Sequence, residues 1–152
     1  MPANYNPHAR KVLSLDLSAT TTVLAGQTED ISVTPPTGKI YNLISAYLRC
    51  SPPTGATSGK HRFEIFSMNI AGVGIYAESD YATEVKVANN CIKTANVDKM
   101  PDTTGDISGA FRTIFGTNSN PFTIKYYNNT DADQSNTRYI RLIVEQFDER
   151  LD

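Results

Sequence analysis

The stretch Pro121–Phe147, PFTIKYYNNTDADQSNTRYIRLIVEQF, carries the clearest structural signal in the 152-residue chain. Apolar residues fall on one parity in its first run and again in its last run: Phe122, Ile124 and Tyr126, then Ile140, Leu142 and Val144. A period of two is typical of a half-buried strand. The Asn, Asp and Ser residues between the runs are typical of a loop. The stretch therefore predicts two antiparallel strands that pair with each other, each with its apolar parity in the core.

The preceding part of the chain shows more short alternating runs. Lys11–Leu17, Thr20–Leu24 and Glu29–Thr34 are separated by turn residues about every ten positions, a spacing typical of a sandwich or barrel. Gly38–Cys50 has apolar residues on both parities, which predicts a central strand covered on both faces. Gly59–Ile70 changes parity near its middle, which predicts a bulge or bend near Phe66.

The whole pattern contains eight or nine short strands and no long amphipathic helix. It predicts an all-β fold: a two-sheet antiparallel sandwich of the jelly-roll or Greek-key type, with little or no helix. We expect an N-terminal arm at residues 1–10, a single sandwich domain at 11–147 and a charged tail at 148–152. Residues 51–59 and 89–106 are rich in Pro, Gly, Thr or Asn and are expected to be loops.

Composition excludes several classes of partner. The net charge is −2 and the basic residues are not clustered, so we expect no nucleic-acid partner. No apolar run approaches the ~20 residues that span a bilayer, and the N-terminus has no apolar signal core, so we expect neither membrane insertion nor export. Cys50 and Cys91 are too few for a disulfide framework. Two buried thiols are the favoured interpretation, and a single bridge is the alternative.

No motif for catalysis is present, and we expect neither an enzyme nor a cofactor. His8 and His61 have no nucleophile or carboxylate at a recurrent motif spacing, so surface or hydrogen-bonded histidines are expected. The alternating oxygen ligands at 129–135 resemble the start of a calcium loop. The positions that should hold Gly and Glu hold Gln134 and Ile140 instead, so no metal site is expected.

Two features indicate contact with another protein. The outward parity of the last two runs carries aromatic, basic and apolar side chains, a mixture that interfaces favour over open surface. The arm at residues 1–10 is either a frayed end or a contact with a neighbouring subunit. The candidate partner contacts are Tyr5, His8, Arg10, Tyr127, Tyr139, Arg141 and Ile143.

The stretches IYNLISAYLRCSPPTGATSGKHRFEIFS (Ile40–Ser67) and NPFTIKYYNNTDADQSNTRYIRLIVEQF (Asn120–Phe147) give the chain a recognisable layout. In this layout it resembles small β-sandwich virion proteins of tailed bacteriophages, of the kind that decorate or cement a capsid. The resemblance implies a non-enzymatic structural protein, made in the host bacterial cytoplasm and located in the virion. It implies binding to the major capsid protein or other virion subunits, as a homo-oligomer with a trimer favoured.

Two other functions remain open at this point. One is a receptor- or carbohydrate-binding module of a phage tail or fibre, which would use the loops at 51–59 and 89–106 together with nearby tyrosines. The other is the coat protein of a small icosahedral virus. A coat that packages a genome usually carries a basic arm, whereas this chain has only Arg10 and Lys11 adjacent near its start.

Overall fold

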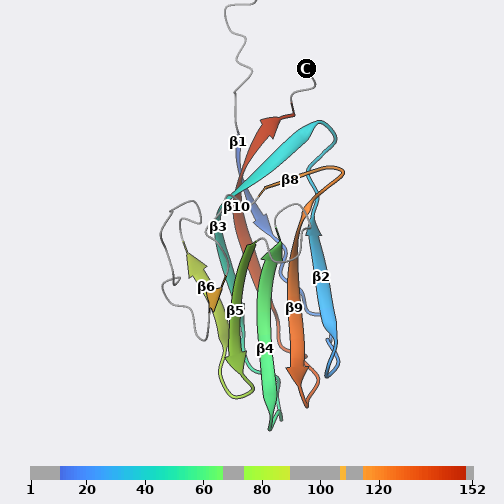
Figure 1. Ribbon diagram of the computed structural model, residues 1–152, viewed down its shortest axis with the longest axis vertical. Helices are drawn as coiled ribbons and strands as arrows, with labels where there is room; N and C mark the ends of the chain where they lie inside the picture. The colour runs from blue at the N-terminus through green and yellow to red at the C-terminus, as the bar shows by residue number, and fades with distance from the viewer. Residues whose placement is uncertain (1–10, 67–73, 90–106, 109–114, 150–152) are drawn as a thin grey trace, which may run out of the picture.

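The computed structural model describes residues 11–66, 74–89, 107–108 and 115–149, which form two antiparallel sheets packed face to face (Figure 1). The strands are β1 (Lys11–Asp16), β2 (Thr28–Val33), β3 (Lys39–Cys50), β4 (Gly59–Phe66), β5 (Gly74–Asp80), β6 (Val85–Asn89), β7 (Ile107–Ser108), β8 (Phe115–Thr117), β9 (Phe122–Thr130) and β10 (Tyr139–Asp148). No helix occurs in these ranges, and so none that could cross a membrane. The predicted all-β sandwich is confirmed.

The strand order is that of a jelly roll. One sheet has the order β1-β10-β3-β6, with β8 also pairing with β3, and the other has the order β2-β9-β4-β5-β7. The pairing is nested: β1 pairs with β10, β2 with β9, β3 with β6 and β4 with β5. Such nesting places most consecutive strands in opposite sheets, and it arises when a long hairpin of strands rolls up on itself.

The predicted pairing of the last two strands is therefore wrong. β9 and β10 belong to different sheets, and residues 131–138 cross from one sheet to the other. Ile124 on β9 lies between Ile31 of β2 and Ile65 of β4. Alternation predicts which side chains face the core, but it does not predict which strand lies alongside. In this chain β9 and β10 each pair with strands distant in sequence and do not pair with each other.

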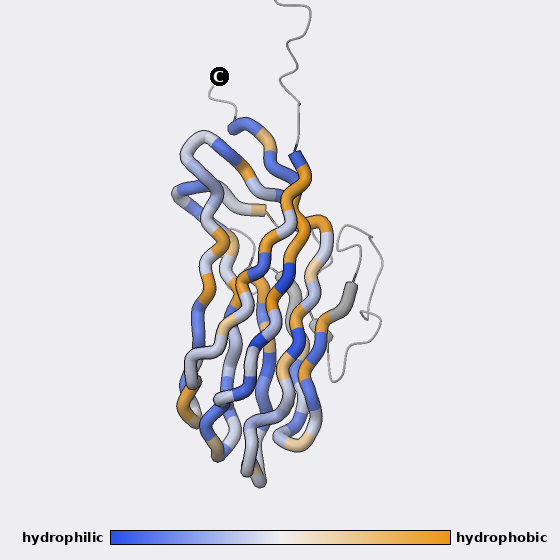
Figure 2. Tube along the Cα trace, turned by 180° about the vertical axis from the view of Figure 1, so that it is seen from behind, coloured by the Kyte–Doolittle hydropathy of each residue, from blue (hydrophilic) through white to orange (hydrophobic). Residues whose placement is uncertain are grey.

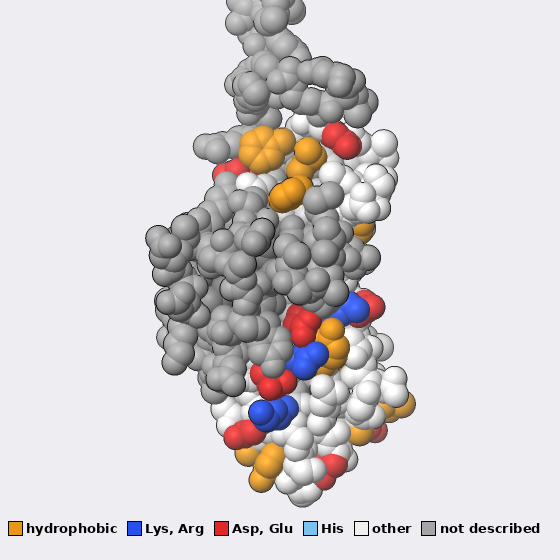
Figure 3. Space-filling view, viewed as in Figure 1, with side chains coloured by type: hydrophobic (Ala, Val, Ile, Leu, Met, Phe, Trp, Pro, Cys, Tyr) orange, Lys and Arg blue, Asp and Glu red, His pale blue; other side chains and the backbone are white. Residues whose placement is uncertain are grey.

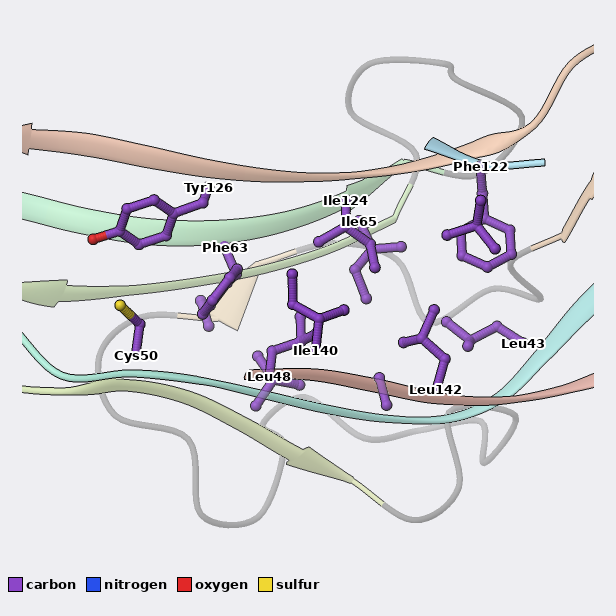
Figure 4. Close-up of a cluster of buried hydrophobic side chains, with 14 of the residues drawn as sticks. Leu43, Leu48, Cys50, Phe63, Ile65, Phe122, Ile124, Tyr126, Ile140 and Leu142 are labelled. Carbon is purple, nitrogen blue, oxygen red and sulfur yellow. The ribbon is translucent and has the colours of Figure 1, made fainter. Parts of the chain in front are cut away.

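The core lies between the sheets and contains the side chains that alternation predicted. Figure 4 shows Ile124, Ile65 and Phe63 of one sheet opposite Ile140 and Leu48 of the other. All six predicted inward residues of β9 and β10 are at most 1% exposed: Phe122, Ile124, Tyr126, Ile140, Leu142 and Val144. This part of the prediction is confirmed.

β3 is a central strand, as predicted, but its outer face carries exposed Arg49, and its apolar residues on two parities come from a bulge instead of from cover on both faces. The register with β10 shifts because Ile143 pairs with Ser45 while Val144 pairs with Leu43, so Ile44 is an extra residue in β3. A bulge of this kind switches the parity that faces the core. Leu43 before it and Ala46 after it are thus both buried in the same core.

Other predicted elements have mixed outcomes. A bulge or bend was predicted near Phe66, but the register of β4 with both neighbours is uninterrupted up to and including Phe66. Residues 67–73 lie outside the described residues. Thr20–Leu24 is not a regular strand: it runs beside the crossover and makes one isolated bridge, Val23 with Gln134, just after the bridge of Ala19 with Arg138. The arm at 1–10 and most of the predicted loop at 89–106 also lie outside the described residues.

Candidate interaction surface

The outer face of the sheet β1-β10-β3-β6 carries a cluster of two tyrosines and two arginines. Tyr139 of β10 lies directly opposite Arg49 of β3, and Arg141 lies directly opposite Tyr47. These four side chains line one shallow depression in the surface. We call this cluster, Tyr47, Arg49, Tyr139 and Arg141, the Tyr–Arg quartet.

The quartet arises from the same short pattern on both strands. β3 contains Tyr47-Leu48-Arg49 and β10 contains Tyr139-Ile140-Arg141. The aliphatic residue in the middle of each triplet is fully buried in the core, which turns the Tyr and the Arg on either side of it outward. Because the strands are antiparallel and Leu48 faces Ile140, the Tyr of each triplet lies beside the Arg of the other.

Each arginine of the quartet has a carboxylate at its outer side. Arg49 Nε donates a hydrogen bond of 2.8 Å to Glu84 Oε2, and Arg141 Nε lies 4.0 Å from Asp16 Oδ2. The Glu84 hydrogen bond, followed by one with Tyr47, raises the pKa of the Arg49 guanidinium above its ordinary value. Hydrogen bonds from Ser18 lower the pKa of Asp16. The surface therefore presents both signs of charge close together.

Apolar groups continue this face beyond the quartet. Ile143 is 40% exposed and lies one outward position past Arg141, while Val12 on the edge strand β1 is 61% exposed. Tyr139 itself is 42% exposed. Figure 2, which views the molecule from behind, shows hydrophobic and hydrophilic segments alternating along the strands on this side. Exposed Tyr beside Arg, with apolar side chains next to them, is typical of protein interfaces.

The outer face of the other sheet is different, because its arginine Arg62 pairs with two carboxylates and also covers the neighbouring tyrosine. Arg62 of β4 lies 2.9 Å from Glu64 and 3.5 Å from Glu78, and its guanidinium stacks 4.0 Å above the ring of Tyr127. Lys125 lies 3.6 Å from Asp30. Figure 3 shows acidic and basic side chains next to one another on this face. Tyr127 is thus covered by its own chain.

A polar network fills the end of the core where the chain crosses between the sheets. His61 is fully buried, with Nε2 2.7 Å from the Thr83 carbonyl oxygen and Nδ1 2.8 Å from the Tyr126 hydroxyl. A carbonyl only accepts, so Nε2 carries the hydrogen and Tyr126 donates to Nδ1. Gln134 Nε2 lies 2.9 Å from the same hydroxyl and 3.1 Å from Cys50 Sγ.

Burial decides the protonation states in this network. Removal from water lowers the pKa of His61, against the opposing effects of the Thr83 carbonyl and the Asp80 charge. The same effect raises the pKa of the free Cys50 thiol to about 12 and also raises the pKa of Tyr126. The groups are neutral near pH 7 and act as structural hydrogen-bond partners, as expected for His61.

Arg138 at the end of the crossover is fully buried. Its guanidinium bonds Glu29 at 3.1 Å and 3.0 Å through two nitrogens, and it also donates to the carbonyl oxygens of Asn136 and Thr21. Its centre lies 5.7 Å from the Tyr126 ring. These contacts join the crossover to β2, so the arginine fixes the path by which the chain changes sheets.

The acidic loop that resembles the start of a calcium site has a structural role. Asp131 accepts hydrogen bonds from the backbone N–H groups of Thr57 and Ser58 and from the Thr57 hydroxyl, which together hold its pKa near 2. Asp133 accepts from the Ala25 N–H at 3.0 Å. Throughout the described ranges, no three His, Cys, Asp or Glu side chains gather as metal ligands would.

The predicted contact residues that the structure describes lie on two opposite faces. Tyr139, Arg141 and Ile143 share the outer face of β10, whereas Tyr127 lies on the opposite face of the sandwich. The single surface predicted for these four residues is therefore wrong, because their strands belong to different sheets. The other three predicted contacts precede the described residues: Tyr5, His8 and Arg10.

Sequence reasoning missed Tyr47 and Arg49 as members of the surface. The available signal was the repeated triplet, since AYLRC at 46–50 and RYIRL at 138–142 share a Tyr and an Arg on either side of a buried aliphatic residue. The repeat becomes informative only when β3 and β10 are known to be neighbours in register.

Comparisons with known proteins give no family. No family model matches the chain, and no curated protein matches it. Among solved structures, the 60-mer BFDV capsid protein is 7% identical, with a TM-score of 0.42 over 95% of this chain and 96% of that one. A family 11 carbohydrate-binding module from Clostridium thermocellum, in complex with a mixed-linked tetrasaccharide, is 14% identical, with a TM-score of 0.32 over 88% and 87% of the two chains.

Proposed function

We propose that the protein is a non-enzymatic virion structural protein that decorates or cements a bacteriophage capsid. It docks on capsid subunits or other virion subunits through the outer face of the sheet β1-β10-β3-β6. The observation that carries this proposal is the Tyr–Arg quartet, an exposed cluster of two residue types that are enriched at the energetic centre of interfaces.

The arrangement of the other polar groups supports a structural role. The buried network around His61, Gln134 and Arg138 joins the crossover to the sheets, and the ion pairs around Arg62 are satisfied within their own face. The quartet, by contrast, is turned outward beside exposed Ile143 and Val12. The jelly roll is also an architecture of viral capsid domains, which is compatible with a place in a shell.

The test is a matched pair of charge reversals. The side chains of Arg141 and Lys60 are both 62% exposed but lie on opposite outer faces. Shells of the encoding phage that carry a subsaturating amount of the wild-type protein are sedimented with each labelled variant, so that shell subunits and copies of this chain are both available to the face. Arg141→Glu should weaken binding by about tenfold or more, and Lys60→Glu should stay within about twofold of wild type. Equal losses for both variants, or a loss only for Lys60→Glu, would contradict the proposed face.

The N-terminal arm is a second contact in this proposal. Tyr5, His8 and Arg10 are of types that interfaces use, and the chain enters β1, the edge strand of the docking sheet, directly after them. Deletion of residues 1–10 should lower shell binding while leaving the unfolding transition of the sandwich unchanged. Full affinity of the truncated protein would remove the arm from the proposal.

A carbohydrate-binding module is the second candidate function. Tyr47 and Tyr139 both line the shallow depression, and exposed tyrosine rings can stack on sugars. A glycan array of wild type and the Tyr139→Ala variant separates the two functions. If wild type binds a sugar and the Tyr139→Ala variant does not, the carbohydrate-binding module is favoured. If wild type binds no glycan on the array, the capsid role is favoured.

A further inference from the structure

The Tyr–Arg quartet has an internal two-fold symmetry. A half-turn about the normal to the sheet, through the buried pair Leu48 and Ile140, exchanges Tyr47 with Tyr139 and Arg49 with Arg141. The two tyrosines therefore occupy one diagonal of a square and the two arginines the other. Directly opposite residues on one sheet face are about 5 Å apart, and successive outward residues on a strand are about 7 Å apart.

An alternating square of this kind is complementary to itself. If a second copy is turned over about a two-fold axis that runs along the strands, its β3 lies over β10 of the first copy. Tyr139 then meets the partner's Arg49, and Arg141 meets the partner's Tyr47. All four corners become cation–π contacts in one step, because each Tyr faces an Arg. A two-fold interface requires self-complementarity of this type.

The same two-fold rotation also determines which charged residues around the quartet face the partner. The rotation places β1 over β6 of the partner, which brings Asp16 to the edge that carries the partner's Lys86. Lys86 lies directly opposite Arg49, which also bonds Glu84, and Asp16 lies directly opposite Arg141. The rotation therefore places Asp16 two positions along the strand from the partner's Lys86. A two-fold axis perpendicular to the strands would also place each Tyr against an Arg of the partner. In that arrangement, however, Ile143 would lie beyond the end of the partner's sheet. The axis along the strands covers more surface.

We propose that the occupant of the quartet is a second copy of this chain, packed face to face through the sheet β1-β10-β3-β6. This inference rests on the proposed function, and it names the virion subunit that this face binds. Two twisted sheets pack aligned within about 30°, which keeps the four corners in reach of one another.

The area of the outer face determines how tightly the two copies are expected to bind. Four strands about 4.8 Å apart, over about eight residues of length, offer on the order of 500 Å² per copy. Stable complexes bury about 800 Å² per partner, so the dimer should be weak and dependent on concentration. A shell that holds copies next to one another raises their effective concentration and would populate the same contact.

Sedimentation equilibrium of the full chain, from about 5 µM to about 1 mM, tests the inference. The weight-average mass should rise from the 16.7 kDa of one chain towards twice that value. Arg141→Glu should abolish the rise, and Lys60→Glu should leave it as in wild type. A wild-type chain that stays monomeric at the highest concentration, or a rise that Arg141→Glu does not change, overturns the inference.

Corner-swapped variants provide an independent test. Tyr47→Arg with Tyr139→Arg makes all four corners cationic, and Arg49→Tyr with Arg141→Tyr makes all four aromatic. Both pairs lie on the surface, and thermal unfolding of each variant confirms that it is folded. The cationic variant alone should be monomeric, and an equal mixture of the two variants should form a heterodimer. Self-association of the cationic variant at wild-type strength would contradict the contact.

The outcomes also separate this inference from the proposed function. If wild type is monomeric while Arg141→Glu abolishes shell binding, the second copy is wrong and the docking face stands. If the dimer forms through the quartet but neither variant nor wild type binds shells, the self-contact stands and the capsid role is wrong.

Discussion

The two outer faces of the sandwich use the same residue types in different ways. On the sheet β2-β9-β4-β5-β7, Arg62 covers Tyr127 and pairs with two glutamates. On the sheet β1-β10-β3-β6, Tyr139 and Arg141 occupy corners of a square and stay exposed, next to exposed Ile143. Arg and Tyr therefore do not mark a docking surface by themselves. What distinguishes the second face is that its aromatic and cationic groups lie outward with apolar neighbours.

Arg138 and Arg141 give the strongest contrast between inside and outside. Arg138 is fully buried and paired with Glu29, whereas the Arg141 side chain is 62% exposed. Arg138→Ala should lower the free energy of unfolding by about 3–5 kcal/mol, because it leaves Glu29 without its partner in a largely buried place. Arg141→Ala should change it by less than about 0.5 kcal/mol. Urea denaturation measures both, and equal effects would contradict the assigned positions.

Acid should weaken the core beneath both faces through His61. The pKa of His61 is lowered in the folded protein, so the unfolded chain binds its proton first, near pH 6.5. Stability is then complete above pH 6.5 and is lost, by at most about 1.4 kcal/mol per pH unit, as the pH falls towards the folded pKa. Urea midpoints between pH 7 and pH 5 measure this slope.

His61→Gln is the control for the acid effect, since glutamine can replace the hydrogen bond to the Thr83 carbonyl without titrating. The variant should have a flatter dependence of stability on pH over the same range. The shifted carboxylates Asp16, Asp80 and Asp131 all have lowered pKa values and act only at lower pH. An unchanged slope in the variant would remove His61 as the cause.

The two tyrosines of the outer faces should differ in their contribution to stability. Tyr127 stacks under Arg62 and donates a hydrogen bond to Glu64 at 3.4 Å, so Tyr127→Ala should cost about 1 kcal/mol. Tyr139→Ala should cost less than about 0.5 kcal/mol in the isolated chain, because its side chain is 42% exposed. Thermal unfolding compares them, and a larger loss for Tyr139 would mean that it supports the fold.

Salt should have only a small effect on the stability that ion pairs contribute on the outer face of the sheet β2-β9-β4-β5-β7. Lys125 lies 3.6 Å from Asp30, whose side chain is 59% exposed. Lys125→Gln should lower stability by about 0.3 kcal/mol at low salt, and by nothing measurable in about 1 M NaCl, because salt screens exposed pairs. Chemical denaturation at two salt concentrations measures the difference. A loss that persists in salt would indicate a contribution other than charge.

The limits of the sequence prediction follow from particular residues. Ile140, Leu142 and Val144 could be placed in the core because alternation is a local property. The neighbour of β10 could not be predicted, because it depends on nested pairing along the whole chain. Arg138 follows a polar block and carries no local signal of burial, because its partner Glu29 is 109 positions away. Such long-range pairs leave no local pattern.

The candidate surface was half predictable for the same reason. Tyr139, Arg141 and Ile143 follow from parity on one strand, and their outward direction was predicted correctly. Tyr127 was grouped with them because a hairpin was expected, and the jelly roll moves it to the other face. Tyr47 joins the surface through the register of β3 with β10, which includes the bulge at Ile44.

Hydroxyl-radical footprinting of the protein on purified phage shells tests the central claim most directly. The oxidation of each peptide is compared between free and shell-bound protein, with the two outer faces as internal controls for each other. Binding should protect Tyr139 and Ile143, and it should leave oxidation of Tyr127 and Lys60 unchanged. Protection of Tyr127 and Lys60, with Tyr139 and Ile143 still oxidised as in the free protein, would contradict the assignment of the docking face.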